Sequence, residues 1–361
     1  MGKLLSICIP TYQRKDSIKF TLDLLIKAVE KHEDEIEVCV SDNGSTDGTW
    51  ELLGEYSKNH PYIRIRRNPE NLGFDNSFVA LMKMADAKYC WPIGDDDEVV
   101  PEGIGRMLGM LRGKDYLLGM IAAGTPEGIA GINRHFPKDE YEKGEFIFNY
   151  VKYVKASGWM APGFGFLGCF LYNVGILKKI IGNFEKGCYG WCQMSVYLHM
   201  LSHFDGKIAI QHEPPVNYGS PPDKVYYPDQ ELYTFSERRL KAFREASLSP
   251  ELSKLVETEL NDFTTQYPRC ILELILIKDI VSREKYDKIA ERVFQLEKGY
   301  NWLSPPGVAA AGLKFLEKLP FSAAPFRLVP KLKNYSRKIR KHEEGVLSTN
   351  EEREAIGKWK K

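Results

Sequence analysis

The stretch that decides the fold reads Trp91-Pro92-Ile93-Gly94-Asp95-Asp96-Asp97-Glu98. The apolar run from Tyr89 to Ile93 is typical of a buried strand, and Pro101 predicts the first turn of a helix. Three consecutive carboxylates therefore follow the carboxyl end of a strand, the edge at which open α/β sheets bind ligands. A divalent cation such as Mg²⁺ relieves the repulsion among clustered carboxylates. A solvated acidic turn is the alternative that this triplet alone leaves open.

The chain before this stretch alternates between strand and helix patterns. Apolar runs predict strands over 4–9, 36–40 and 62–65, and helical periodicity covers 15–29, about 49–58 and 74–85. Such alternation predicts a parallel sheet with right-handed crossovers, a Rossmann-like nucleotide-binding half. The sequence contains neither G-x-G-x-x-G nor G-x-x-x-x-G-K-[ST], which argues against dinucleotide and P-loop chemistry.

Two further strand-end loops carry unusual polar chemistry. The first reads Ser41-Asp42-Asn43-Gly44-Ser45-Thr46-Asp47-Gly48-Thr49, and the second runs from Asn68 to Asn76. All these residue types also favour ordinary helix caps and turns. Each loop alone therefore leaves open whether it binds a ligand or only ends a strand.

Four motifs in order carry a specific resemblance. They are Ile9-Pro10-Thr11-Tyr12-Gln13-Arg14, the loop around Asp42, Asn71-x-Gly73-x-x-Asn76, and Tyr89-x-Trp91-x-x-Gly94-Asp95-Asp96-Asp97-x-x-x-Pro101. In this order and spacing they resemble the family 2 glycosyltransferases of GT-A fold, in particular a bacterial subgroup of abequosyltransferase-like, surface-polysaccharide enzymes. The likeness covers about residues 4–110 and is weaker to about 220.

The resemblance implies a donor site made from these motifs. The first loop lines the nucleotide pocket with Pro10, Thr11, Tyr12 and Arg14, and Asn71 and Asn76 join the substrate-binding residues. Asp42 matches the acid that accepts a hydrogen bond from the base, which suits N3–H of uracil or thymine. A UDP- or dTDP-sugar is therefore the expected donor.

The same resemblance assigns the acidic triplet. Asp96 matches the second acid of the family's D-x-D motif and is expected to bind Mn²⁺ or Mg²⁺ under the diphosphate. Asp95 is expected near the ribose or sugar, and Asp97 is expected to support the metal site. Many members have Asp where this chain has Gly94. The roles of the family's acids therefore map less directly onto Asp95, Asp96 and Asp97.

The proton acceptor is where this chain departs from the family. Members commonly begin the acceptor-side helix with an acid pair, but the matching positions here are Cys192 and Gln193. Neither side chain is an oxygen base. Glu185 in the preceding loop is the predicted catalytic base, and Asp205, His199 and His203 are the alternatives.

The predicted domain order is a GT-A domain over 1–225, with a donor-binding half (1–110) and an acceptor half (111–225), then a helical appendage (226–324). The last segment, 325–361, begins with seven Lys and Arg residues and no acid between Pro325 and Lys341. Such a basic segment with interleaved apolar residues suits an anionic membrane surface. A solvated basic helix or tail is the alternative.

Composition argues against several other classes of protein. The 361 residues are 43% hydrophobic with a formal net charge of +1, which argues against a nucleic-acid-binding protein. Seven cysteines without a C-x-x-C pair indicate free thiols in a reducing compartment. Without a signal-peptide pattern or an 18-residue apolar run, we expect a cytoplasmic protein, peripheral at the inner face of the cell membrane.

The sequence therefore predicts an inverting, metal-dependent glycosyltransferase that transfers a sugar from a nucleotide-diphosphate donor. The expected acceptor is a glycan or lipid-linked molecule in cell-surface polysaccharide or glycoconjugate assembly. The missing acid pair motivates the alternative, a non-catalytic nucleotide- or glycan-binding protein on a GT-A scaffold.

Overall fold

The computed structural model describes residues 2–125, 128–129, 136–157, 166–185 and 192–217, and the single residues Pro250 and Asp287. All of these except Asp287 belong to the first of two units, which comprises residues 1–223 and 241–256. Apart from those two single residues, the predicted appendage (226–324) and basic tail (325–361) lie outside the described part of the chain.

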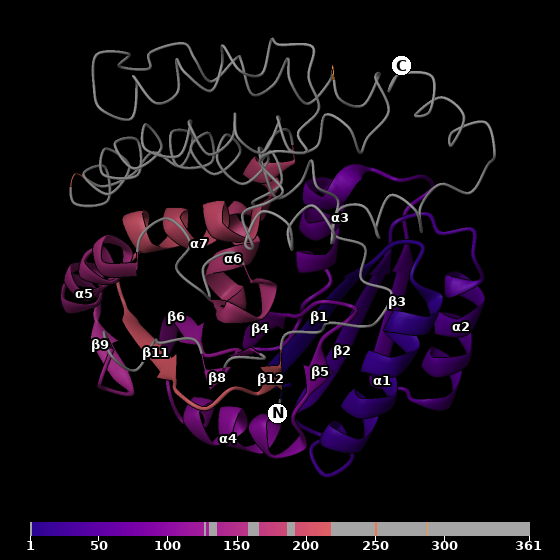
Figure 1. The fold of residues 1–361 in the computed structure, drawn as a ribbon, viewed down its shortest axis with the longest axis horizontal. Helices are drawn as coiled ribbons and strands as arrows, with labels where there is room; N and C mark the ends of the chain where they lie inside the picture. Colours follow the sequence, from indigo (N-terminus) through magenta and orange to yellow (C-terminus); the bar gives the residue numbers. More distant parts are fainter. Residues whose placement is uncertain are drawn as a thin grey trace, which may run out of the picture. The chain divides into compact units, whose positions relative to one another are not determined.

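An eight-stranded sheet in the order β3-β2-β1-β4-β10-β6-β11-β9 organises this unit (Figure 1). Its strands are β1 (Leu5–Thr11), β2 (Ile36–Asp42), β3 (Ile63–Arg67), β4 (Tyr89–Pro92), β6 (Tyr116–Ile121), β9 (Glu140–Glu142), β10 (Phe170–Asn173) and β11 (Lys207–Gln211). Strands β1 to β4 pair in parallel, as predicted for the nucleotide-binding half. Because β10 runs antiparallel to both β4 and β6, the whole sheet is mixed.

Helices cover both faces of this sheet. On one face lie α1 (Lys15–Val29), α2 (Thr49–Asn59) and α4 (Pro101–Leu111), and on the other lie α3 (Gly73–Met82), α6 (Val174–Ile180) and α7 (Cys192–His203) (Figure 1). Helix α5 (Lys143–Ser157) packs beside β9 and β11. The predicted helix over 15–29 has the observed bounds of α1. Both faces being covered explains why the central strands are continuous apolar runs.

A second, four-stranded sheet was not predicted. It has the order β5 (Glu98–Val99), β12 (Val216–Asn217), β7 (Gly124–Thr125) and β8 (Gly128–Ile129). Strand β5 lies between the acidic triplet and α4, and it pairs antiparallel with β12. The segment after the triplet is thus fixed to a strand more than a hundred residues later. Strands of only two residues have no sequence pattern from which this pairing could be predicted.

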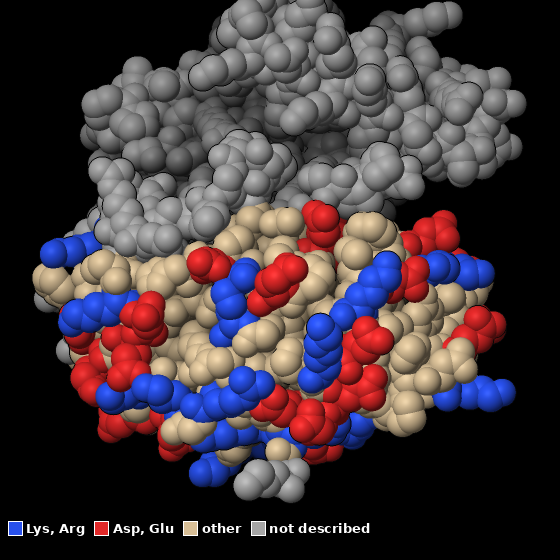
Figure 2. All heavy atoms as spheres, turned by 90° about the horizontal axis from the view of Figure 1, so that it is seen from below, with Lys and Arg blue, Asp and Glu red and all other residues tan. Residues whose placement is uncertain are grey.

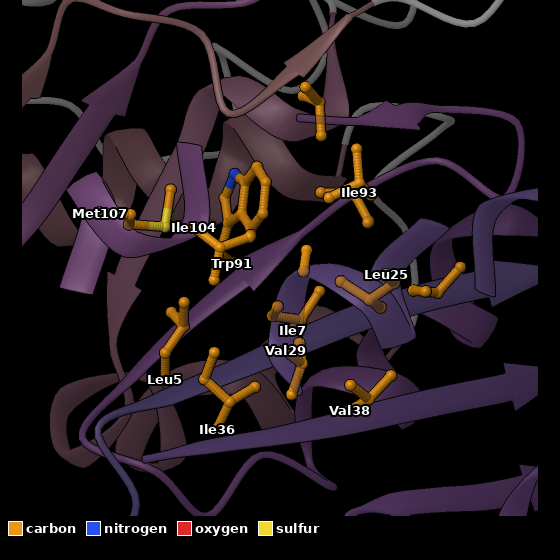
Figure 3. Close-up of a cluster of buried hydrophobic side chains, with 14 of the residues drawn as sticks. Leu5, Ile7, Leu25, Val29, Ile36, Val38, Trp91, Ile93, Ile104 and Met107 are labelled. Carbon is orange, nitrogen blue, oxygen red and sulfur yellow. The ribbon is translucent and has the colours of Figure 1, made fainter. Parts of the chain in front are cut away.

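The main core lies between the sheet and helices α1 and α4 (Figure 3). Alternate residues of the central strands supply it, because successive side chains of a strand point to opposite faces. The labelled core residues in Figure 3 are Leu5, Ile7, Leu25, Val29, Ile36, Val38, Trp91, Ile93, Ile104 and Met107. This packing holds the carboxyl ends of β1, β2 and β4 in fixed positions.

The intervening strand positions point to the face that α3 covers. Cys8, Cys39 and Cys90 are buried there as free thiols, and Cys90 Sγ lies 3.8 Å from Met82 Sδ of α3. All five described cysteines are free and buried, as predicted. No helix within the described ranges is long and apolar enough to span a bilayer. Figure 2 shows acidic and basic side chains interspersed on one face of the molecule.

Candidate active site

The candidate site is built on three strand ends that lie in register. Thr11, the last residue of β1, pairs with Asp42, the last residue of β2, and Asp42 pairs with Arg67 at the end of β3. Parallel pairing therefore brings a hydroxyl, a carboxylate and a guanidinium to one edge of the sheet. The acidic triplet follows β4, which pairs with β1 on its other side.

Asp95 and Asp96 meet at this edge around one arginine nitrogen. Arg14 Nη1 lies 3.0 Å from Asp95 Oδ1 and 3.0 Å from Asp96 Oδ2. Thr11 Oγ1 donates to Asp95 Oδ2 at 2.7 Å. Both acids are buried, with 7% and 8% of their surface exposed. The structure thus joins Thr11 and Arg14 of the first motif to the acids of the last.

Asp97 turns back toward the backbone of its own turn. Its Oδ2 accepts a hydrogen bond from Gly94 N–H at 2.7 Å, and its carbonyl oxygen accepts one from Thr21 Oγ1. A Cβ on Gly94 would lie 2.9 Å from Asp96 Oδ1 and 3.1 Å from Asp97 Oδ2. Glycine at position 94 therefore lets both carboxylates fold against the backbone, which gives the departure from the family pattern a steric reason.

The carboxyl group of Asp95 has an unusual pKa. The pKa of Asp95 is raised to about 6, mainly by burial and also by the neighbouring charge of Asp96, although Arg14 and Thr11 act in the opposite direction. A buried carboxylate with a raised pKa in a ligand-binding edge is a mark of a functional site. A further cation beside Asp95 would favour its ionised form.

Gln13, which sequence reasoning did not select, fixes the position of Arg14. Its φ of 53° is the one positive value at a non-glycine residue in the described ranges. Gln13 N–H donates to Ser45 Oγ at 2.8 Å, and the Gln13 side chain exchanges hydrogen bonds with Thr46. Left-handed backbone at a non-glycine residue is strained and concentrates at functional sites. The contacts with the second loop hold it there, and only the folded structure reveals them.

Asp42 is completely buried behind these loops. Both of its carboxylate oxygens accept from Ser45 N–H, at 3.1 and 3.3 Å, and Arg67 Nε lies 3.3 Å from Oδ2. The Arg67 guanidinium also lies over the Trp50 ring, 5.7 Å from its centroid. Arg67 was missed in the sequence, because only the strand register shows that it neighbours Asp42.

Asn71 and Asn76 border the same edge as exposed residues. Asn71 Oδ1 accepts from Asn43 Nδ2 at 2.7 Å, and Asn43 Oδ1 accepts from Asn68 Nδ2 at 2.9 Å. Asn43 therefore joins the two polar loops into one unit. Asn76 Nδ2 donates locally to Leu72 O at 3.1 Å. Pro10 is partly buried, and Tyr12 is 40% exposed.

Glu185 lies apart from the acid pair. It pairs with Lys83, directly after the carboxyl end of α3, and its side chain is half exposed. Helix α3 follows β3 and precedes β4, so it runs from the carboxyl edge of the parallel strands back to their amino edge. Lys83 therefore marks the edge opposite to the acid pair. Glu185 as the base stays a prediction, and this placement does not favour it.

The amino end of α3 carries a carboxylate, Asp75, that was not among the predicted site residues. Asp75, in the first turn of α3, accepts a hydrogen bond at Oδ1 from Cys192 N–H at 3.2 Å. Cys192 is the first residue of α7, the helix at which an acid pair was expected. Asp75 thus supplies a partly exposed carboxylate at the start of α7.

The donor set fits a divalent cation that completes its coordination with ligand oxygens. Among the described residues no group of three or more His, Cys, Asp or Glu side chains is arranged to hold a metal ion. Two hard carboxylate oxygens do converge, on the point that Arg14 Nη1 occupies. Mg²⁺ typically takes one or two carboxylates together with phosphate oxygens and waters. Asp95 and Asp96 meet that requirement.

The fold and site define a nucleotide-diphospho-sugar transferase scaffold of GT-A type. Residues 6–181 match the family described as glycosyl transferase family 2. The chain therefore contains a domain of this family, as its motifs indicated.

Two curated relatives extend the comparison. The abequosyltransferase RfbV of Salmonella typhimurium is 42% identical over 102 residues, which is 28% of this chain and 30% of that protein. The chondroitin synthase of Escherichia coli is 29% identical over 118 residues, which is 33% of this chain and 16% of the synthase. The matches thus span less than a third of each relative's length.

Solved structures agree on the fold. The mannosyltransferase PcManGT from Pyrobaculum calidifontis, in complex with GDP-Man and Mn²⁺, has a TM-score of 0.52 at 12% identity and covers 95% of this chain and 87% of its own. Residues 1–349 of S. aureus TarS, in complex with UDP-GlcNAc, give 0.53 at 16% identity over 87% and 90%. At such identities they confirm the predicted GT-A fold and nothing finer.

Proposed function

We propose that this protein is an inverting, metal-dependent glycosyltransferase that uses a nucleotide-diphosphate sugar. One observation carries the proposal: two groups of buried carboxylates lie at the same edge of the sheet. Asp95 and Asp96 share Arg14 there, and Asp42 lies two strands away. The family 2 domain supports the reaction class. An acceptor in cell-surface polysaccharide assembly, either a glycan or a lipid-linked molecule, is part of the same proposal.

Asp42 and Arg67 suit a uracil or thymine base. A carboxylate accepts a hydrogen bond from N3–H, and an adjacent guanidinium donates to a ring carbonyl oxygen. Cytosine has no N3–H to donate, so the pair would favour UDP- or dTDP-sugars over CDP-sugars. Since this contact is remote from the bond that breaks, it would contribute to donor affinity more than to turnover.

Asp96 would hold the cation together with Asp95, and Asp97 would brace the turn through Gly94 N–H. A bound divalent cation supplies Lewis-acid stabilisation of the leaving diphosphate. Thr11 orients Asp95 through its 2.7 Å hydrogen bond. These side chains thus present negative oxygens to the metal side of the donor.

Transfer with inversion needs a group that removes the acceptor hydroxyl proton during attack. Glu185 was the predicted group, and Asp75 is the carboxylate that the folded chain holds at the start of α7. The hydrogen bond from Cys192 N–H occupies one oxygen of Asp75 and orients the side chain. We therefore propose Asp75 as the stronger candidate.

A panel of sugar nucleotides tests the proposal on the full chain. UDP-, dTDP-, CDP- and GDP-sugars would be added with Mn²⁺ or Mg²⁺, and a bound donor raises the melting temperature. The stabilising donor, radiolabelled in its sugar, is then incubated with lipid-linked and free glycan acceptors. Transfer that stops on adding EDTA supports the proposal. Donor binding without sugar transfer or hydrolysis would support the non-catalytic alternative instead.

Membrane association is a separate part of the proposal and rests on sequence alone, because 325–341 lie outside the described residues. Each Lys or Arg near an anionic surface contributes roughly 1 kcal/mol, so seven would hold a peripheral enzyme reversibly. Deleting 325–361 should abolish sedimentation with phosphatidylserine vesicles while leaving transfer to a soluble acceptor intact. Equal sedimentation by both proteins would contradict it.

A further inference from the structure

Arg14 occupies the place where a metal ion would bind. A single nitrogen, Nη1, lies 3.0 Å from an oxygen of each acid. Cation ligands of this kind lie at about 2.0–2.1 Å from Mg²⁺. A guanidinium and a divalent cation therefore cannot both sit between Asp95 and Asp96. Without a metal, Arg14 supplies the positive charge that two buried carboxylates require.

The side chain of Arg14 can leave this position while its backbone stays. Residue 14 follows the clamped residue Gln13 and directly precedes α1. Its own side chain is 39% exposed, whereas the two acids it contacts are buried. The side chain thus has open space on its outer side. That space adjoins the amino end of α1, whose dipole favours an anion and whose first N–H, of Lys15, donates to Asp47 Oδ2.

We infer that Arg14 is an internal cation that closes the metal site and exchanges places with the incoming metal. When the metal arrives with the donor, the guanidinium moves from the carboxylates to the diphosphate, for which its fork geometry is suited. The donor step rests on the proposed function. The exchange itself needs the metal site proposed for Asp95 and Asp96, but neither a donor nor sugar transfer.

This exchange predicts coupling between metal and nucleotide. Metal alone must displace Arg14 without giving it a new partner, so it binds weakly. Nucleotide diphosphate gives both the metal and the guanidinium a partner, so each ligand strengthens the binding of the other. Thermodynamic coupling of this sort is typically about 5- to 150-fold.

The test is Mn²⁺ binding without donor, measured on the full chain from the electron paramagnetic resonance signal of free Mn²⁺. Arg14→Gln should bind Mn²⁺ alone at least about 10-fold more tightly than wild type. Lys15→Gln, the same loss of charge one residue further on, is the matched control and should leave the affinity unchanged. The double variant R14Q/D96N should lose the gain, which would locate the ion at the acids.

The second measurement uses coupling. Adding UDP should tighten Mn²⁺ binding to wild type about 10-fold or more, and R14Q should lose most of that effect. Circular dichroism checks folding of each variant. If R14Q does not fold, Arg14→Lys carries the test, because an ammonium cannot make a forked contact with the diphosphate and should reduce the coupling. Unchanged Mn²⁺ affinity and unchanged coupling would overturn the inference, whether or not sugar transfer is found.

Discussion

Buried carboxylates lie at both edges of the parallel strands, but they differ in their hydrogen-bond partners. At the amino edge, Glu37 of β2 is buried and saturated: it accepts from Ser6 Oγ, from Arg64 Nη1, and from the N–H groups of Asp86 and Ala87. At the carboxyl edge, Asp95 has Thr11 and shares Arg14 with Asp96.

The pKa directions follow from this difference in partners. Burial raises the pKa of Glu37, but the hydrogen bonds from Ser6, Asp86 N–H and Arg64 outweigh it, and the net pKa is lowered. For Asp95 burial prevails, and its pKa rises to about 6. A buried acid with its hydrogen bonds complete is a structural element. A buried acid with fewer hydrogen bonds and a raised pKa is a candidate ligand-binding residue.

The largest loss of transfer is expected at the carboxyl edge. Asp96→Ala removes a proposed metal ligand, so the turnover number should fall by about 10³-fold or more, since a bound cation contributes several kcal/mol to leaving-group stabilisation. Steady-state transfer with a labelled donor measures it. Asp86→Ala, an exposed acid at the amino edge, is the matched control and should retain turnover. Near-wild-type transfer by D96A would remove Asp96 from this role.

The next effect separates the two ends of α3. If Asp75 accepts the proton, Asp75→Asn should lower the turnover number by roughly 10²-fold or more with donor affinity kept. Glu185→Gln, at the amino-edge end, should then stay within about threefold of wild type. The pH profile of turnover for both variants adds a check, because losing the base removes the acidic limb. The reverse result would restore the sequence-based choice of Glu185.

A smaller effect is expected two strands from the acid pair. Asp42→Asn should raise the KM for the donor roughly 10-fold while changing the turnover number little, because a base contact is similar in the ground and transition states. Glu51→Gln, an exposed acid in the first turn of α2, is the control and should leave the KM unchanged. A collapse in turnover at unchanged KM would contradict the assignment of Asp42.

The smallest effect on transfer is expected from Glu37→Gln, which should instead lower stability by about 1–3 kcal/mol by weakening a buried network. Because the folded pKa of Glu37 is lowered, its stabilising contribution is present above the unfolded pKa of about 4.3 and is lost as pH falls through the folded pKa. Urea unfolding between pH 3 and 7 should therefore show a shallower acid loss for the variant than for wild type. Identical acid profiles would show that Glu37 contributes no such linkage.

Sequence by itself determined the elements and the edge that carries the chemistry. Apolar runs marked β1, β2 and β4, and polar residues after each of them marked the carboxyl edge, because side-chain period and turn chemistry are local properties. Helix α1 has the predicted bounds. The motifs from Pro10 to Asp96 likewise indicated the family, since their order and spacing are written in the chain.

Only the tertiary structure decided which of these residues meet. Arg14 contacts two acids more than eighty positions away, Arg67 reaches Asp42 through strand register, and Asp75 meets Cys192 across two helices. Glu185 lay near the expected helix in sequence, yet the direction of α3 carries its partner Lys83 to the opposite edge. Long-range contacts depend on how packed layers align, and no local pattern encodes that alignment.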